Sequence, residues 1–174
     1  MDSAKNFVPW FSSGRKPKDV DELLKDVLKL HVTGIIIHGR PDKRYVYWSY
    51  QHLKGNANLN IECMRRALAH ALHTLGFRPK LHVQFDGASD NRNLTMIALG
   101  EWLVDQGLVS KVEFSMLPVG HTHEDIDAMF RFIADSLRRV GLVRTPQEFE
   151  MCTKTAVSEG IHVEHVSWVR YSIL

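Results

Sequence analysis

The chain has little cysteine, no long apolar run and no apolar leader. Its two cysteines, Cys63 and Cys152, are too few for a disulfide framework or a cysteine zinc cluster. Both lie in segments with a helical pattern, and we expect both to be reduced. No apolar run approaches the roughly 18 residues of a membrane span, and residues 1–16 lack the apolar core of a secretory signal. These absences predict an intracellular protein that does not enter a membrane.

The chain also has little net charge, since its 22 basic and 20 acidic residues leave a formal charge of +2. A nucleic-acid partner would therefore need a local basic surface, or one supplied by another region or chain. With 174 residues and 44% hydrophobic content, the composition is that of one ordinary domain with a real core. We expect a single domain over 1–174, with a loop at 1–18, a core at 19–143 and a C-terminal helix and tail at 144–174. The sequence is compatible with a homo-oligomer.

Hydrophobic periodicity predicts an alternation of strands and helices after the first loop. Helices are predicted at 20–28, 58–75, 92–107, 126–140 and 145–157, and strands at 31–39, 44–50, 80–87 and 109–120, with a final strand or tail at 162–174. A strand pair followed by helix–strand units is typical of an α/β protein whose later strands pair in parallel. Such sheets carry their chemistry at the carboxyl ends of strands, where Asp86 and the segment LPVGHTHEDID (117–127) occur.

Among the acids of these strand ends, Asp86 is the clearest candidate for a functional role, because it ends a mostly apolar strand and is hard to explain as a helix cap. Asp90 precedes a helix and fits a cap better. For Asp127, which lies deeper in its helix and one turn from His123, a structural and a functional role are equally supported.

Glu124 and Asp125 also fit a structural role at the start of a helix. Thr122 and Asp125 have the spacing of a capping box, and acids in a first turn favour the positive end of the helix dipole. The structural interpretation is therefore preferred for both acids.

The histidines suggest one alternative chemistry. The run HTHEDID, which contains His121 and His123, begins like the H-x-H-x-D-H run of metallo-β-lactamase-type hydrolases. Ile126 stands where the last histidine belongs, and little chain remains to supply further zinc ligands. A zinc hydrolase is therefore the less favoured alternative. The remaining histidines at scattered helix and loop positions receive no role, and they include His70, His73, His162 and His165.

Two motifs resemble a family of uncharacterised transposon-derived domains. QFDGASDNRN is similar to that family's L-D-N-C-x-x-E-N-K-N, and LPVGHTHEDIDAMF matches its L-P-V-G-H-T-H-E-D-I-D-x-x-F almost without change. Upstream, NANLNIECMRRAL and MDSAKNF are also similar to family segments, so the resemblance covers most of the chain. It implies a ribonuclease H-like fold of the transposase and integrase kind, a mixed sheet flanked by helices.

The resemblance also implies a catalytic site made of three acids that bind two divalent ions, magnesium or manganese. Carried over by position, these acids are Asp2, Asp86 and Asp127, with Glu124 and Asp125 as substitutes for the third. Carboxylate oxygens suit magnesium, and two ions about 3.5–4 Å apart would clamp a phosphodiester. His121 and His123 would orient an acid or touch a phosphate, while Asn91, Arg92 and Asn93 would contact the DNA backbone.

Some features depart from the family pattern. Gly87 replaces an asparagine, Asp90 replaces a glutamate, and the loop between these two residues is one residue shorter than in the family. Because Asp2 is the second residue, we expect the first strand to be truncated, Asp2 to be poorly supported, and the chain as given to be nearly inactive, as a fragment or decayed copy.

Two functions therefore follow from the sequence. The first is metal-dependent phosphodiester cleavage or strand transfer on DNA, with the nucleus as the expected location. The second is a catalytically silent, domesticated module that binds nucleic acid or protein.

For the first function we expect the strand ending at Asp86 to lie beside the strand at 31–39, or at the edge left by a missing first strand. Asp127 should then face Asp86.

Overall fold

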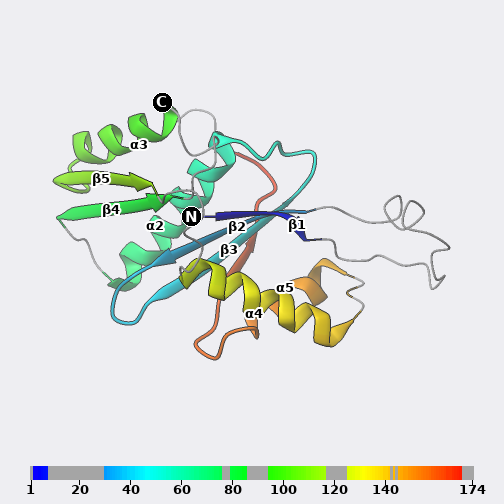
Figure 1. The fold of residues 1–174 in the computed structure, drawn as a ribbon. Helices are drawn as coiled ribbons and strands as arrows, with labels where there is room; N and C mark the ends of the chain where they lie inside the picture. The colour runs from blue at the N-terminus through cyan, green and yellow to red at the C-terminus, as the bar shows by residue number, and fades with distance from the viewer. Residues whose placement is uncertain are drawn as a thin grey trace.

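A computed structural model describes residues 2–7, 30–75, 79–85, 94–116, 125–141, 143 and 145–169, with the backbone alone for 2–7. These residues form a mixed α/β structure of six strands and four helices (Figure 1). The strands are β1 (Asp2–Phe7), β2 (Leu30–Ile37), β3 (Lys43–Tyr50), β4 (Lys80–Phe85), β5 (Lys111–Met116) and β6 (His162–His165). The helices are α2 (Ala57–Leu75), α3 (Leu94–Asp105), α4 (Asp125–Val140) and α5 (Pro146–Lys154).

The strands form one sheet of order β1-β2-β3-β6 and one separate pair, β4-β5. β2 pairs antiparallel with β1 and with β3, whereas β3 pairs with β6 and β4 with β5 in parallel. The predicted turn between β2 and β3 is confirmed, and the Gly39 amide donates to Asp42 Oδ1 at 2.9 Å within it. Of the two alternatives for the C-terminal segment, residues 162–165 form the strand.

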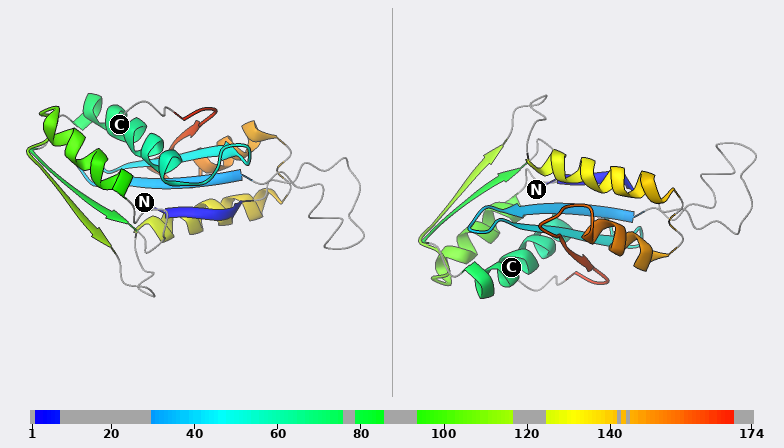
Figure 2. Two further views of the ribbon diagram at one scale, coloured as in Figure 1. Left: turned by 90° about the horizontal axis from the view of Figure 1, so that it is seen from above. Right: turned by 90° about the horizontal axis from the view of Figure 1, so that it is seen from below.

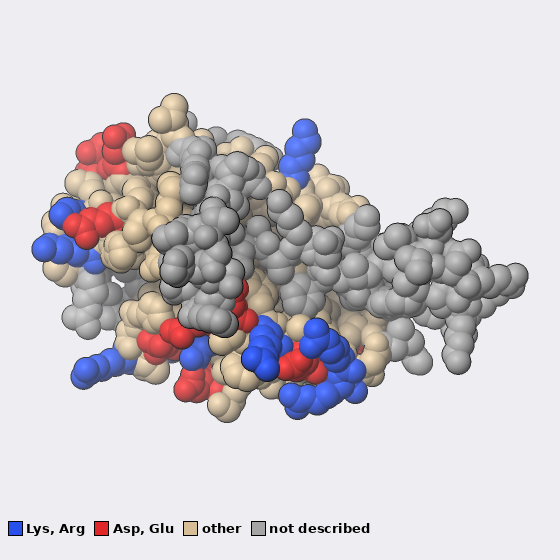
Figure 3. Space-filling model, viewed as in Figure 1, with Lys and Arg blue, Asp and Glu red and all other residues tan. Residues whose placement is uncertain are grey.

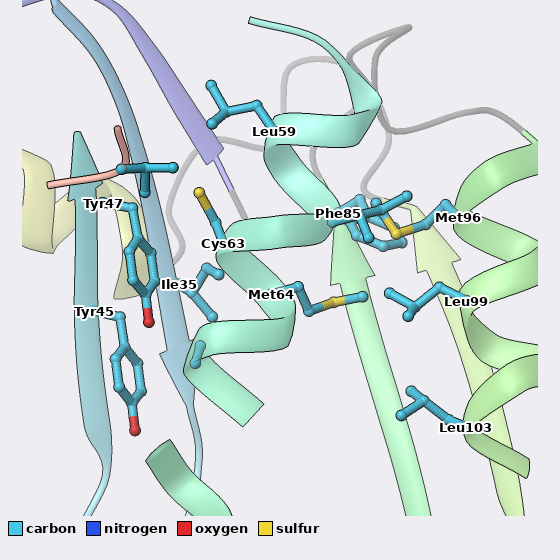
Figure 4. Packing of buried hydrophobic residues seen from close by; sticks show 13 residues of the cluster. Ile35, Tyr45, Tyr47, Leu59, Cys63, Met64, Phe85, Met96, Leu99 and Leu103 are labelled. Carbon is cyan, nitrogen blue, oxygen red and sulfur yellow. The ribbon is translucent and has the colours of Figure 1, made fainter. Parts of the chain in front are cut away.

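Helices cover both faces of the four-stranded sheet (Figure 2). Because side chains alternate along a strand, Tyr45 and Tyr47 of β3 belong to one apolar cluster, while Val46 and Trp48 belong to the other. The first cluster includes side chains of α2, α3 and β4, such as Met64, and Figure 4 shows this packing. The second cluster includes side chains of α4 and α5. The sheet is therefore the middle layer of three.

Several helix ends have residues that are typical of helix caps. Thr145 caps α5 by accepting a hydrogen bond from the Glu148 amide at 3.1 Å, with Pro146 at the first helical position. Gly141 follows α4 with a φ of 77°, a left-handed conformation that favours glycine. The side chain of Asn56, which the sequence did not single out, accepts from two amides in the first turn of α2.

Two predictions about the first residues are wrong. Asp2–Phe7, predicted to be a loop, is a six-residue strand on β2, so a strand does follow the second residue and the expected lack of support for Asp2 is not found. The segment DSAKNF has few residues of high strand propensity, and an apolar neighbour such as β2 can impose pairing that local sequence does not predict. The helix predicted at 20–28 lies outside the described residues.

Of the two expected positions for β4, the one beside the strand at 31–39 is also wrong. β2 is hydrogen-bonded on both sides, to β1 and to β3, and therefore leaves no edge for β4. β4 pairs with β5 instead.

No helix in the described part of the chain is both long enough and apolar enough to cross a membrane.

Candidate functional site

Side chains of α4 approach the sheet closely at Gly34 of β2. A Cβ atom built on Gly34 would lie 2.7 Å from Phe130 Cζ and 2.8 Å from Met129 Cε, distances that real side chains do not tolerate. Met129 is buried and Phe130 is partly buried. A larger residue at this position would therefore force the ends of these two side chains to shift.

Gly34 is also the residue that pairs with Asp2 of β1. Residues directly opposite each other in an antiparallel ladder occupy the same face of the sheet. The register position of Asp2 therefore belongs to the face that α4 covers.

Asp125 and Asp127 both lie in the first turn of α4. Asp125 is exposed, whereas Asp127 is partly buried and precedes Phe130 by three residues, about one helical turn. Asp127 thus lies on the side of α4 that carries the contact with Gly34. An acidic side chain in the first turn of a helix interacts favourably with the helix dipole.

The beginning of β1, the carboxyl end of β4 and the beginning of α4 lie close together. Figure 1 shows the arrowhead of β4 beside the start of β1, and both views of Figure 2 keep these two ends next to the start of α4. Phe85, the last residue of β4, is buried and stacks on Phe114 with ring centroids 5.8 Å apart. The chain therefore brings together the elements that carry or directly precede Asp2, Asp86 and Asp127.

Most of the other predicted site residues lie outside the described part of the chain. They are Asp86, His121, His123 and Glu124, together with the expected DNA contacts Asn91, Arg92 and Asn93. Within the described ranges, no group of three or more His, Cys, Asp or Glu side chains is arranged to hold a metal ion.

The structure adds a concave site that the sequence did not predict. It lies between the β2–β3 turn, the segment before β6 and the C-terminal half of α2. The Tyr45 hydroxyl and His70 Nδ1 share a hydrogen bond of 3.1 Å, and the rings of His70 and His162 lie 4.6 Å apart. Burial raises the pKa of Tyr45. Three segments far apart in sequence form this site, so no local motif could have revealed it.

A buried carboxylate, Glu62 of α2, was also not predicted. It is 1% exposed and accepts hydrogen bonds from Arg65 and Arg66 at 2.7–3.0 Å. Arg66 continues the network to Glu164 of β6 at 2.5 Å. Burial alone would raise the pKa of Glu62, but the hydrogen bonds and charges of both arginines outweigh it and lower that pKa. This network joins α2 to β6 and has a structural role.

Charges of both signs are mixed on the face shown in Figure 3, where acidic and basic side chains alternate around α4. The helix ends with Arg138 and Arg139, both exposed, and Arg138 pairs with Asp135 at 2.7 Å. On this face the described residues do not form an extended basic surface.

Comparison with known proteins identifies one family. Residues 21–172 match the family described as "Domain of unknown function (DUF7869)", a range that includes β2 to β6 but not β1. No curated protein and no solved structure gives a significant match to the chain. Since the match covers most of its length, the chain belongs to the family of domains of unknown function DUF7869.

Proposed function

We propose that the chain is a ribonuclease H-like domain of the transposase and integrase kind. In this proposal it binds DNA, and it cleaves or transfers phosphodiester bonds with magnesium or manganese at Asp2, Asp86 and Asp127. One observation carries the proposal. Asp2 pairs with Gly34, and α4 packs against Gly34 through Phe130, which lies one helical turn after Asp127.

The strand pairings support this proposal in part. A ribonuclease H-like sheet has its first strand at the centre, and here that strand would lie between β2 and β4. The β1–β2 and β2–β3 ladders correspond to one half of such a sheet, and the parallel β4–β5 pair corresponds to the other. No ladder joins β1 to β4 among the described residues.

The three proposed aspartates suit magnesium, because hard carboxylate oxygens are the ligands that magnesium prefers. When bound, two such ions would activate the attacking water or 3′-hydroxyl and stabilise the leaving oxygen. Asp127 would hold the metal from the first turn of α4. The packing of Phe130 on Gly34 would fix the separation between α4 and β1.

A second function is a catalytically silent module that binds nucleic acid or protein through the same fold. Among the described residues no ladder joins β1 to β4, and this favours the silent module, because the backbone then does not fix the end of β4 relative to Asp2 and catalysis needs a preorganised site. Such a module would keep its partner binding without cleavage.

A plasmid-nicking assay with manganese tests the proposal, with DNA binding measured in parallel on the same samples. The nuclease hypothesis predicts cleavage that Asp86→Asn and Asp127→Asn each reduce by about a hundredfold or more. Asp125→Asn is the matched control, because it removes the same charge from the same helical turn at an exposed position.

The outcomes separate the alternatives. DNA binding without nicking by the wild-type chain would favour the silent module. Loss of activity in Asp125→Asn but not in Asp127→Asn would make Asp125 the third acid. Cleavage that survives Asp86→Asn would refute the proposed site. Activity that needs zinc and depends on His121 and His123 would instead support the hydrolase alternative.

A further inference from the structure

The pocket beside the β2–β3 turn has buried walls and a charged rim. Tyr45 and Ile161 are both buried and form part of its lining, with His70 and His162 beside them. The cavity volume is about 720 Å³, enough for a group of nucleotide size. The site lies on the α2 side of the sheet, because Tyr45 belongs to the apolar cluster that α2 covers.

Both acids that line the pocket are already engaged. Asp42 accepts the Gly39 amide and lies 3.5 Å from His38, and the hydrogen bond from that amide is the main cause that lowers its pKa. Glu159 forms an ion pair with Arg44. Neither carboxylate is therefore free to neutralise the remaining cations of the rim.

Two of those cations, Arg40 and Lys43, have no acidic partner within ion-pair distance among the described residues. Both line the pocket together with the two histidines. An arginine fork, a lysine ammonium and two imidazoles are the donors with which proteins bind phosphate oxygens.

From this arrangement we infer that the pocket lined by Arg40, Lys43, His70 and His162 binds a phosphate group. The ligand class is a phosphate, either free, on a nucleotide or in a nucleic-acid backbone. This inference does not depend on the proposed nuclease site, because Asp127 lies on α4, which covers the other face of the sheet.

A bound anion should favour the protonated form of His70. Burial lowers the pKa of His70, and the nearby groups His162, Lys43 and His73 lower it further, while Glu164 acts in the opposite direction. Tyr45 also contacts His70, but its own pKa is raised and it stays neutral in this range. A bound phosphate would favour imidazolium, so protonation and binding should strengthen each other.

The test is a nitrogen-15 NMR titration with inorganic phosphate at constant ionic strength and one fixed pH, about 6.5. Shifts should concentrate at Gly39–Arg44 and Gly160–His162. Lys43→Gln should weaken binding about fivefold or more. The matched control is Lys54→Gln, which removes an exposed lysine after the other end of β3 and should change the affinity less than about twofold.

The same titration with a nucleoside 5′-monophosphate and a short single-stranded oligonucleotide identifies the source of the phosphate. Equal affinity for all three would indicate a site for phosphate alone, and much tighter oligonucleotide binding would indicate a nucleic-acid backbone. The inference is overturned if none of the three shifts these resonances, or if Lys43→Gln and Lys54→Gln weaken binding equally.

Discussion

Gly34→Ala should destabilise the protein by loosening α4 from the sheet. The added methyl would come within 2.7–2.9 Å of Met129 Cε and two atoms of the Phe130 ring. Overpacking of this kind costs about 1–3 kcal/mol, while alanine recovers about 0.4–1 kcal/mol by restricting the unfolded chain. The expected net loss in the free energy of unfolding is therefore about 1–2 kcal/mol.

The assay is urea unfolding followed by far-UV circular dichroism, with Phe130→Leu combined with Gly34→Ala in a double-mutant cycle. A smaller side chain at 130 leaves room for the methyl, so the double mutant should lose less than the sum of the two single losses. Gly141→Ala is the control, because it is strained by its positive φ and has nothing within 4 Å for Phe130→Leu to relieve. A neutral Gly34→Ala, or strictly additive losses, would refute the close contact between α4 and β2.

Three further results are expected. Glu62→Gln should cost about 2 kcal/mol by leaving two arginines without their buried partner. The pKa of Glu62 in the folded protein lies below the ordinary value of 4.5, so its contribution to stability is present above pH 4.5 and is lost as the pH falls through the folded pKa. The urea midpoint of the variant should therefore fall less in acid than that of the wild type. Cys63, whose pKa burial raises to about 12, should react with a thiol reagent only after unfolding, and fast labelling at neutral pH would contradict its burial. His165 stacks on Trp48 and has a pKa lowered mainly by burial, so it should contribute stability above pH 6.5 that is lost as the pH falls below that value. His165→Phe should flatten this loss in urea midpoints, while the exposed control His73→Gln should not.

Much of the secondary structure could be predicted because the pattern of each element is local. The apolar repeat of α4 ends at Gly141, and the Thr145–Pro146 cap fixes the start of α5. β1 could not be predicted, since DSAKNF becomes a strand through pairing with β2 and not through its own composition.

The candidate site residues divide in the same way. Asp127 could be proposed from the sequence because it follows a strand–helix junction with a recognisable motif, and the structure then adds its distance of one turn from the Gly34 contact. The Tyr45–His70–His162 cluster has no such signal, because its members come from a strand, a helix and a second strand far along the chain. Histidines that are scattered along the sequence can be recognised as a cluster only when the tertiary structure brings them together.

The two candidate sites can be tested separately because of the alternation of side chains in β2 and β3. Gly34 pairs with Val46 on the face that α4 covers, whereas Ile35 pairs with Tyr45 on the face that α2 covers. A charge change at Lys43, on the rim of the pocket, therefore need not move the backbone around Asp127. If Lys43→Gln alters phosphate binding and leaves manganese binding unchanged, while Asp127→Asn does the reverse, the sheet supports two independent sites. If each substitution affects both ligands, one continuous binding surface must instead pass around the edge of the sheet.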